Sequence, residues 1–185
     1  MKYRREIVMA DGNALLLRSL GVQDAEETIR VCRKTAGETL NLIRYEDEWT
    51  ITPEQERAHI RSMENNPKAL MLGAYLRGEM VGVASFAPPA SVDRARHRAN
   101  LGVTILKSCW GRGIGKAMMQ ALIEQAKTTA IEQLELEVVG ANERAIRLYE
   151  QFGFEVFARH PRKLKYRDGT YADMLLMMLD LQKVK

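Results

Sequence analysis

The sequence predicts one α/β (α+β) domain in which helices flank a mixed sheet. Helical and strand periodicities alternate along the chain and do not fall into separate blocks. Helices and a strand alternate over residues 113–151, which favours a sheet that is partly parallel around that segment. The 185 residues, of which 46% are apolar, can bury one core, and no linker or repeat divides them. We therefore expect residues 1–185 to form a single domain.

The N-terminal half begins with two strands around a turn. Residues 4–9 and 14–19 flank an Asp-Gly-Asn sequence at 11–13, which is typical of a hairpin. Apolar residues at helical spacing then predict a helix over residues 22–36, which Gly37 would end.

An irregular, acidic stretch over residues 38–52 leads into a second helix. Thr52 is suited to the N-cap, Pro53 to the first helical position and Gln55 to the third. This helix should end near residues 65–67, where the sequence reads Asn-Asn-Pro.

The second half of the chain alternates strands with helices. Strands are expected over residues 69–76, 80–87, 99–106 and 134–138, with a helix over 113–129.

The C-terminal region should contain one more helix and two strands. The helix spans residues 142–152 and ends at Gly153, a residue favoured just after a helix C-terminus. Strands over 154–159 and 171–181 flank a basic loop over 161–169.

Composition and charge limit the classes of function. The net charge of +4 comes with basic clusters at 94–98 and 159–167, which could meet nucleic acid or be solvated loops near cofactor phosphates. No nucleic-acid-binding module accompanies them, so the sequence argues against a nucleic-acid partner. The apolar run at 174–179 fits either a buried central strand or a dimer seam, and we expect a homodimer.

Cysteine, histidine and apolar patterns indicate a metal-free cytoplasmic protein. The 2 cysteines form no disulfide framework, and the 3 histidines lack metal-ligand spacing. No signal-peptide core and no apolar run of membrane-spanning length is present, so no membrane partner is expected.

A glycine-rich run at residues 110–116 predicts an anion site between a strand and a helix. It fails the dinucleotide pattern because Lys116 stands at the third glycine position, and the P-loop pattern because Ala117 lacks a hydroxyl group. A tight turn needs one glycine, whereas this run has three within five residues. Bare amides at a helix start suit a pyrophosphate.

A second motif runs from Asn142 to Phe154. Asn142 and Tyr149 are seven residues apart, two helical turns, and so share one helix face. The alternative interpretation of Asn142 is that it only caps the helix. The alternative interpretation of Tyr149 is that it is an aromatic residue of the core.

These two motifs resemble those of the GNAT superfamily of N-acetyltransferases. The acetyl-CoA signature of that family, Gln/Arg-x-x-Gly-x-Gly/Ala, falls on residues 110–115, with Trp110 in place of the usual Gln or Arg. The later signature, an Asn that opens a helix ending in Leu-Tyr-x-x-x-Gly-Phe, falls on residues 142–154. The similarity is firm over residues 100–154.

The resemblance implies a sheet of about seven strands, splayed between the fourth and fifth, with about four helices. Residues 101–106 would part from 134–139, and acetyl-CoA, as co-substrate, would bind between them. The cofactor-binding residues it implies are Thr104, Ile105, Gly111, Arg112, Gly113, Ile114, Gly115, Lys116 and Asn142.

The resemblance also implies direct attack of an amine on the thioester in a ternary complex. Tyr149 would be the catalytic general acid, and a main-chain N–H near Thr104 would stabilise the oxyanion. The acceptor would be a primary amine of a small molecule or of a peptide or protein N-terminus, and the acidic stretch 38–49 favours a cationic one.

The general base and two rival functions stay open at this level. The candidate bases are Glu38, Glu46, Asp47 and His97, or a water relay. One rival function is a non-catalytic acyl-CoA-binding regulator, and the other is a basic nucleic-acid-binding module.

Overall fold

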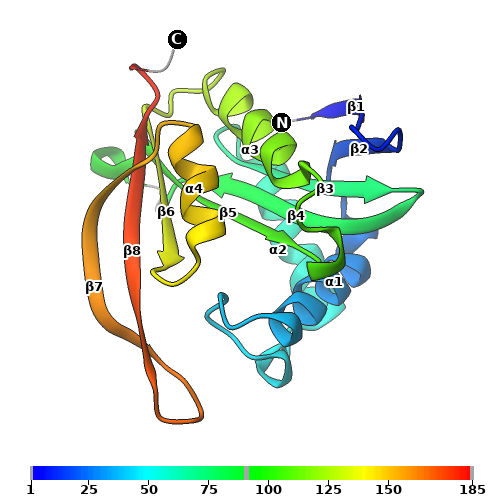
Figure 1. The fold of residues 1–185 in the computed structure, drawn as a ribbon. Helices are drawn as coiled ribbons and strands as arrows, with labels where there is room; N and C mark the ends of the chain where they lie inside the picture. Colours follow the sequence, from blue (N-terminus) through cyan, green and yellow to red (C-terminus); the bar gives the residue numbers. More distant parts are fainter. Residues whose placement is uncertain (1, 90–91, 184–185) are drawn as a thin grey trace.

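A computed structural model describes residues 2–89 and 92–183 (Figure 1). Its strands are β1 (Arg4–Val8), β2 (Ala14–Ser19), β3 (Leu70–Leu76), β4 (Glu79–Ala87), β5 (Arg98–Ile105), β6 (Gln133–Val139), β7 (Glu155–Lys165) and β8 (Tyr171–Asp180). Its α-helices are α1 (Ala25–Glu38), α2 (Pro53–Asn65), α3 (Ile114–Ala126) and α4 (Glu143–Gln151).

The described strands form one mixed sheet in the order β1-β2-β3-β4-β5-β6-β8-β7. All neighbours are antiparallel except β5 and β6, which confirms the expectation of a partly parallel sheet. The sheet has eight strands where about seven were expected. The strands that were expected to splay as the fourth and fifth are β5 and β6, because the N-terminal hairpin adds a strand to the count.

The middle of the sheet is buried on both faces, and this fixes the strands that lead to the site. Most residues of β3 and β4 are buried. Helices α1 and α2 pack on one side of these strands and α3 packs on the other (Figure 1). The apolar core is continuous from β2 to the C-terminal strands.

Two predicted helix boundaries are confirmed by their caps. The Thr52 hydroxyl accepts the Gln55 N–H at 3.3 Å, and the Gln55 side chain accepts the Thr52 N–H at 2.9 Å, so the capping box is complete. After α4, Gly153 adopts φ 86°, the left-handed conformation expected of a glycine that ends a helix.

The prediction that Gly37 ends the first helix is wrong. Helix α1 continues through Gly37 to Glu38. A Cβ atom on Gly37 would lie 2.3 Å from a carboxylate oxygen of Glu46, so the absent side chain leaves room for Glu46 to approach. The glycine therefore serves packing at this position and does not end the helix.

The predicted basic loop over 161–169 is also partly wrong. Strand β7 extends to Lys165 and pairs Leu164 with Ala172 and Lys165 with Tyr171, so only residues 166–170 form the turn. The register shifts between His160 and Leu164. Proline has no N–H to donate to a neighbouring strand. An edge strand such as β7 pairs on one side only and can therefore include Pro161.

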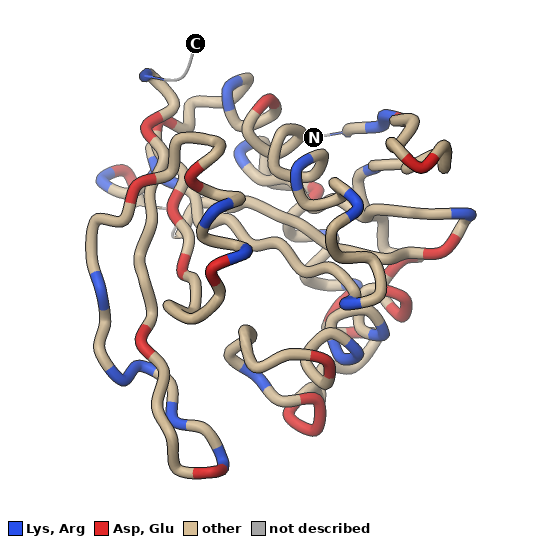
Figure 2. The backbone as a smooth tube through the Cα atoms, in the orientation of Figure 1, with Lys and Arg blue, Asp and Glu red and all other residues tan. Residues whose placement is uncertain are grey.

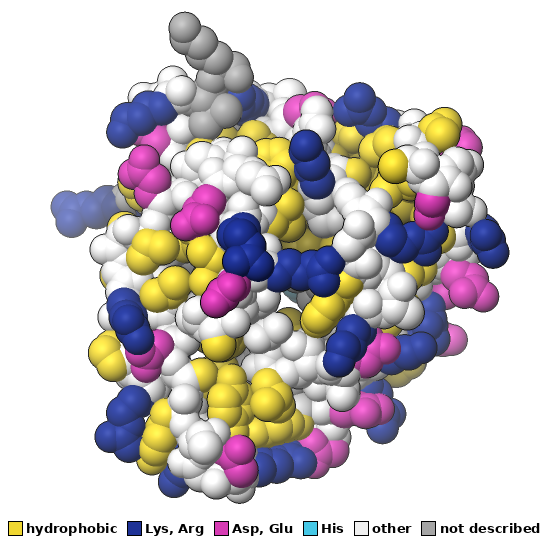
Figure 3. Space-filling view, viewed as in Figure 1, with side chains coloured by type: hydrophobic (Ala, Val, Ile, Leu, Met, Phe, Trp, Pro, Cys, Tyr) yellow, Lys and Arg dark blue, Asp and Glu magenta, His cyan; other side chains and the backbone are white. Residues whose placement is uncertain are grey.

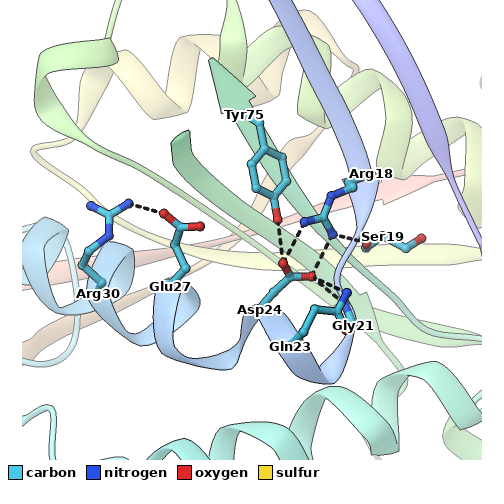
Figure 4. A network of polar contacts seen from close by, with 8 residues as sticks. All are labelled: Arg18, Ser19, Gly21, Gln23, Asp24, Glu27, Arg30 and Tyr75. Carbon is cyan, nitrogen blue, oxygen red and sulfur yellow. Dashed lines mark hydrogen bonds and ion pairs between the residues drawn. The ribbon is translucent and has the colours of Figure 1, made fainter. Parts of the chain in front are cut away.

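A buried ionic network anchors the start of α1 to the sheet (Figure 4). The Asp24 carboxylate accepts both Arg18 guanidinium nitrogens at 2.7 Å, the Gly21 N–H at 2.8 Å and the Tyr75 hydroxyl at 3.3 Å. Burial alone would raise the pKa of Asp24, but the Arg18 and Gly21 hydrogen bonds outweigh it and hold the pKa below its ordinary value.

We predict that Asp24→Asn lowers the free energy of unfolding by about 2–3 kcal/mol at neutral pH, since it leaves the Arg18 guanidinium without a counter-charge. Because the pKa of Asp24 is depressed by folding, its contribution is present above about pH 4 and is lost as the pH falls further. The difference between wild type and variant in urea unfolding should therefore shrink with acid.

The control for this experiment is Glu26→Gln, which breaks only an exposed pair with Arg57. We expect it to change stability by less than about 0.5 kcal/mol. An Asp24→Asn protein as stable as this control at neutral pH would contradict the assigned role.

Candidate functional site

The central feature of the site is a gap between β5 and β6. The two strands pair only at Arg98 with Gln133, Ala99 with Leu134 and Asn100 with Glu135. Beyond Asn100, β5 continues beside β4, whereas β6 continues beside β8. One edge of β5 therefore carries main-chain groups with no strand opposite them.

The hydrogen-bond alternation identifies which residues of β5 face this gap. The Leu106 N–H donates to Val81 on the β4 side, and the His97 carbonyl accepts from Gln133 on the β6 side. Because peptide groups alternate in direction along a strand, odd-numbered residues face β6 and the gap. Val103 and Ile105 thus present their N–H and C=O groups to the gap.

The prediction for Thr104 needs correction on this point. Thr104 lies opposite Val83 in the β4–β5 register, and its peptide groups are directed toward β4. Its N–H is therefore used within the sheet, and the two neighbouring N–H groups that face the gap belong to Val103 and Ile105. Ile105, in contrast to Thr104, presents its peptide groups to the gap.

Trp110, the departure from the expected signature, is tied to the end of the gap. Its indole N–H donates to the Ile105 carbonyl at 2.7 Å. A carbonyl oxygen has two lone pairs, so Ile105 keeps one position for a ligand. The bond holds the glycine loop, residues 110–116, against the last residue of β5.

The glycine loop has the backbone that its glycines predict. Gly111 has φ 77° and Gly113 has φ 84°, and Gly113 is the N-cap of α3. Within the described ranges, no hydrogen bond leaves the main-chain N–H groups of residues 111–116. These amides, at the positive end of a helix, form a concave donor set for an anion.

The remaining side chains of the loop have structural contacts. A Cβ atom on Gly115 would lie 3.1 Å from Leu148, so this glycine lets α3 and α4 approach closely. Arg112 pairs with Asp11 at 2.6 Å, which ties the loop to the β1–β2 turn. The Asn13 N–H and then Arg112 lower the pKa of Asp11 to about 2. Lys116 is exposed beside the loop amides.

The second motif forms α4, whose N-cap is Asn142. The Asn142 side chain accepts the Ala145 N–H at 3.3 Å, so the capping interpretation is correct, and one amide hydrogen-bonding group remains for other partners. Tyr149 is the buried residue of this helix, and burial raises the pKa of its phenol to about 12. Its ring packs at 6.0 Å from that of Phe154.

A cleft of about 740 Å³ is lined in part by Trp110. It is bordered by the end of α1, by residues 39–47, by Lys107 and by Arg167. The turn between β7 and β8 closes on it, because the Arg167 N–H donates to the Tyr45 hydroxyl at 3.0 Å. Trp110 therefore takes part both in the end of the gap, through Ile105, and in the lining of this cleft.

The four candidate bases are not equivalent in the structure. Glu38 lies at the cleft and accepts the Lys107 N–H at 2.7 Å, only two residues beyond Ile105. Glu46 also borders the cleft, and Asp47 does so while paired with Arg167 at 2.7 Å, which lowers the pKa of Asp47. His97 precedes β5 at its opposite end, about 26 Å along the strand from Ile105.

The described ranges contain no group of three or more His, Cys, Asp and Glu side chains arranged to hold a metal ion. None of the helices in those ranges has the length and apolar character needed to cross a membrane.

Comparison with known proteins gives one family match, to the model described as "Acetyltransferase (GNAT) family", over residues 36–154. A curated relative is the L-methionine sulfoximine/L-methionine sulfone acetyltransferase of Pseudomonas paraeruginosa. It is 23% identical over 174 residues, which make up 91% of this chain and 96% of the relative.

Solved structures show the same fold. An acetyltransferase of the GNAT family from Streptococcus pneumoniae aligns with a TM-score of 0.86 and 25% identity, covering 90% of this chain and 99% of that one. A phosphinothricin acetyltransferase from Sinorhizobium meliloti, solved in complex with acetyl-CoA, aligns with a TM-score of 0.77 and 19% identity, covering 89% and 86%.

We predict that Trp110→Phe lowers the free energy of unfolding by about 1 kcal/mol, because it removes the hydrogen bond to Ile105 and keeps an aromatic ring. Trp49→Phe is the matched control, since the buried Trp49 indole nitrogen has no partner among the described residues. Chemical denaturation of both variants measures the difference, and equal losses of stability would argue against the Trp110 bond.

Proposed function

The chain belongs to the acetyltransferase (GNAT) family, and on that premise we propose that it transfers the acetyl group of acetyl-CoA to the primary amine of a small molecule. The observation that carries the proposal is the gap between β5 and β6, with the free amides of the glycine loop at its end. A peptide or protein N-terminus is the wider alternative acceptor, which the open cleft beside Trp110 would admit.

The residues at the gap fit the two halves of coenzyme A. The amides of residues 111–116 suit its diphosphate, because N–H groups at a helix start bind anions. Gly111 and Gly113 allow the loop to adopt this backbone, since their positive φ values would strain a residue with a side chain. The pantetheine arm has amide groups, which can pair with Val103 and Ile105 as an added strand would. Asn142 can supply a further hydrogen bond from α4.

Acetyl-CoA supplies an activated acetyl group as a thioester, and the chain's own groups handle charge and protons. The Val103 N–H can stabilise negative charge that develops on the acetyl oxygen. Tyr149 can donate its phenolic proton to the departing sulfur. A phenol with a pKa of about 12 is protonated at neutral pH, as a general acid must be.

The proposed acceptor site is the cleft beside Trp110, and Glu38 is the proposed base. Its position is fixed by the Lys107 N–H, which binds one carboxylate oxygen and leaves the other available. Glu38 would take a proton from the acceptor ammonium before attack. The cleft carries both signs of charge, with Arg33 and Lys107 beside Glu38 and Glu46, which suits small polar amines.

We further propose a cytoplasmic protein of one domain, residues 1–185, that forms a homodimer. The continuous core supports the single domain. Edge strand β7 exposes 46% of Val156 and 53% of Phe157, which supports a partner on this strand.

The rival functions differ in what the structure offers them. The second basic cluster is partly neutralised, because Arg159 pairs with Asp173, Lys163 with Glu137 and Arg167 with Asp47. This pairing reduces the free positive charge that the cluster could offer to nucleic acid. A non-catalytic acyl-CoA-binding protein would use the same gap and would bind coenzyme A without turnover of any amine.

The proposal is tested by release of free thiol from acetyl-CoA with a panel of amino acids, polyamines and peptides. Turnover of at least one amine is expected. We predict that Tyr149→Phe lowers kcat by about 100-fold while the Kd for coenzyme A is unchanged, since only a proton donor is lost. Tyr166→Phe is the control, and an unchanged kcat for Tyr149→Phe would remove this residue as the acid.

For the base, we predict that Glu38→Gln lowers kcat/KM by about 100-fold at pH 7 and by much less near pH 9–10. Alkaline solution deprotonates the acceptor amine and so replaces the missing base. Glu46→Gln, in the same cleft, should keep the wild-type pH profile. If both variants gave that profile, Glu38 would not be the base.

A further inference from the structure

Arg144, the second residue of α4, reaches from one side of the gap to the other. Helix α4 follows β6, whereas the glycine loop follows β5. The Arg144 guanidinium carbon lies 5.5 Å from the centre of the Trp110 ring. One of its terminal nitrogens lies 3.0 Å from the place that a Cβ atom on Gly111 would take.

This position puts the guanidinium over the end of the gap, beside the free amides of the glycine loop. Figure 3 shows Lys and Arg side chains gathered around a hollow in the middle of the face in view. In Figure 2 the start of α4 carries basic and acidic residues close together. A cation at this place adds to the field of the helix α3 N-terminus.

Arg144 differs from its neighbour Arg147 in having no anionic partner. Within the described residues, no ion pair or hydrogen bond of Arg144 is found, and its contact is with the face of Trp110. Arg147, one helical turn later, pairs with Glu143 at 2.9 Å. A guanidinium beside main-chain amides forms a set of hydrogen-bond donors that suits an anion.

Gly111 has a second role in this arrangement. Its φ of 77° already favours glycine, and a Cβ atom there would crowd the Arg144 guanidinium, one nitrogen of which would lie 3.0 Å away. The same glycine therefore exposes a loop amide and gives Arg144 access to it.

We propose that Arg144 binds the diphosphate of coenzyme A from the α4 side, opposite the glycine-loop amides, an inference that rests on the proposed function. A guanidinium presents paired donors that match two phosphate oxygens. The diphosphate would then be held from both sides of the gap, by main-chain amides of the loop that follows β5 and by a side chain of α4, the helix that follows β6. Arg144 exchanges its contact with Trp110 for this pairing.

The test compares wild type with Arg144→Gln, Arg144→Lys and the matched control Arg147→Gln, each checked for folding by circular dichroism. Calorimetry with coenzyme A should give a Kd raised about tenfold or more for Arg144→Gln, because a charged hydrogen-bond donor is lost. Arg144→Lys should recover part of the lost affinity, since lysine keeps the positive charge but lacks the paired N–H donors of a guanidinium. Arg147→Gln should match wild type.

A thioester that lacks the diphosphate distinguishes phosphate binding from a change in the shape of the gap. With acetyl-pantetheine, Arg144→Gln should have the kcat/KM of wild type. With 3′-dephospho-coenzyme A, which keeps the diphosphate, the variant should show the same loss in Kd as with coenzyme A.

Three results would overturn the inference while leaving the proposed function intact. The first is a Kd for coenzyme A that is equal in Arg144→Gln and Arg147→Gln. The second is a kcat/KM with acetyl-pantetheine that falls in Arg144→Gln as much as the affinity for coenzyme A does. The third is a Kd for 3′-dephospho-coenzyme A that is equal in Arg144→Gln and wild type. Failure of the wild-type protein to bind coenzyme A would overturn the proposed function and this inference together.

Discussion

The site depends on the separation of two parallel strands after three residue pairs. Once β5 and β6 part beyond Asn100, one edge of β5 has donors and acceptors without a strand beside them. Unpaired main-chain groups inside a protein are costly, so such an edge persists only where water or a ligand satisfies it. An extended, amide-bearing ligand has the chemistry that the missing strand would have had.

The elements around the gap stabilise it from several directions. On the β5 side, β4 is buried on both faces, and the Trp110 indole holds the last carbonyl of the strand. Gly115 allows α4 to pack closely on α3, while the Arg112–Asp11 pair connects the glycine loop to the β1–β2 turn. Trp110 therefore contributes both to the end of the gap and to the proposed acceptor cleft.

Local rules were sufficient where the cause is local. The capping box at Thr52, the left-handed Gly153 and the positive φ values of Gly111 and Gly113 each depend on a few neighbouring residues. The alternation at Thr104 could not be predicted, since it needs the register with β4. Gly37 was misinterpreted because its reason is a distant contact with Glu46. Arg144 lies off the helix face shared by Asn142 and Tyr149, and only the fold brings it to Trp110.

Amide hydrogen exchange at residues 102–105, followed by NMR with and without coenzyme A, tests the central claim most directly. If the ligand occupies the missing strand position, the amides of Val103 and Ile105 gain protection, and those of Gly102 and Thr104, already directed at β4, change little. Equal protection of all four, or protection of Gly102 and Thr104 alone, would contradict the account.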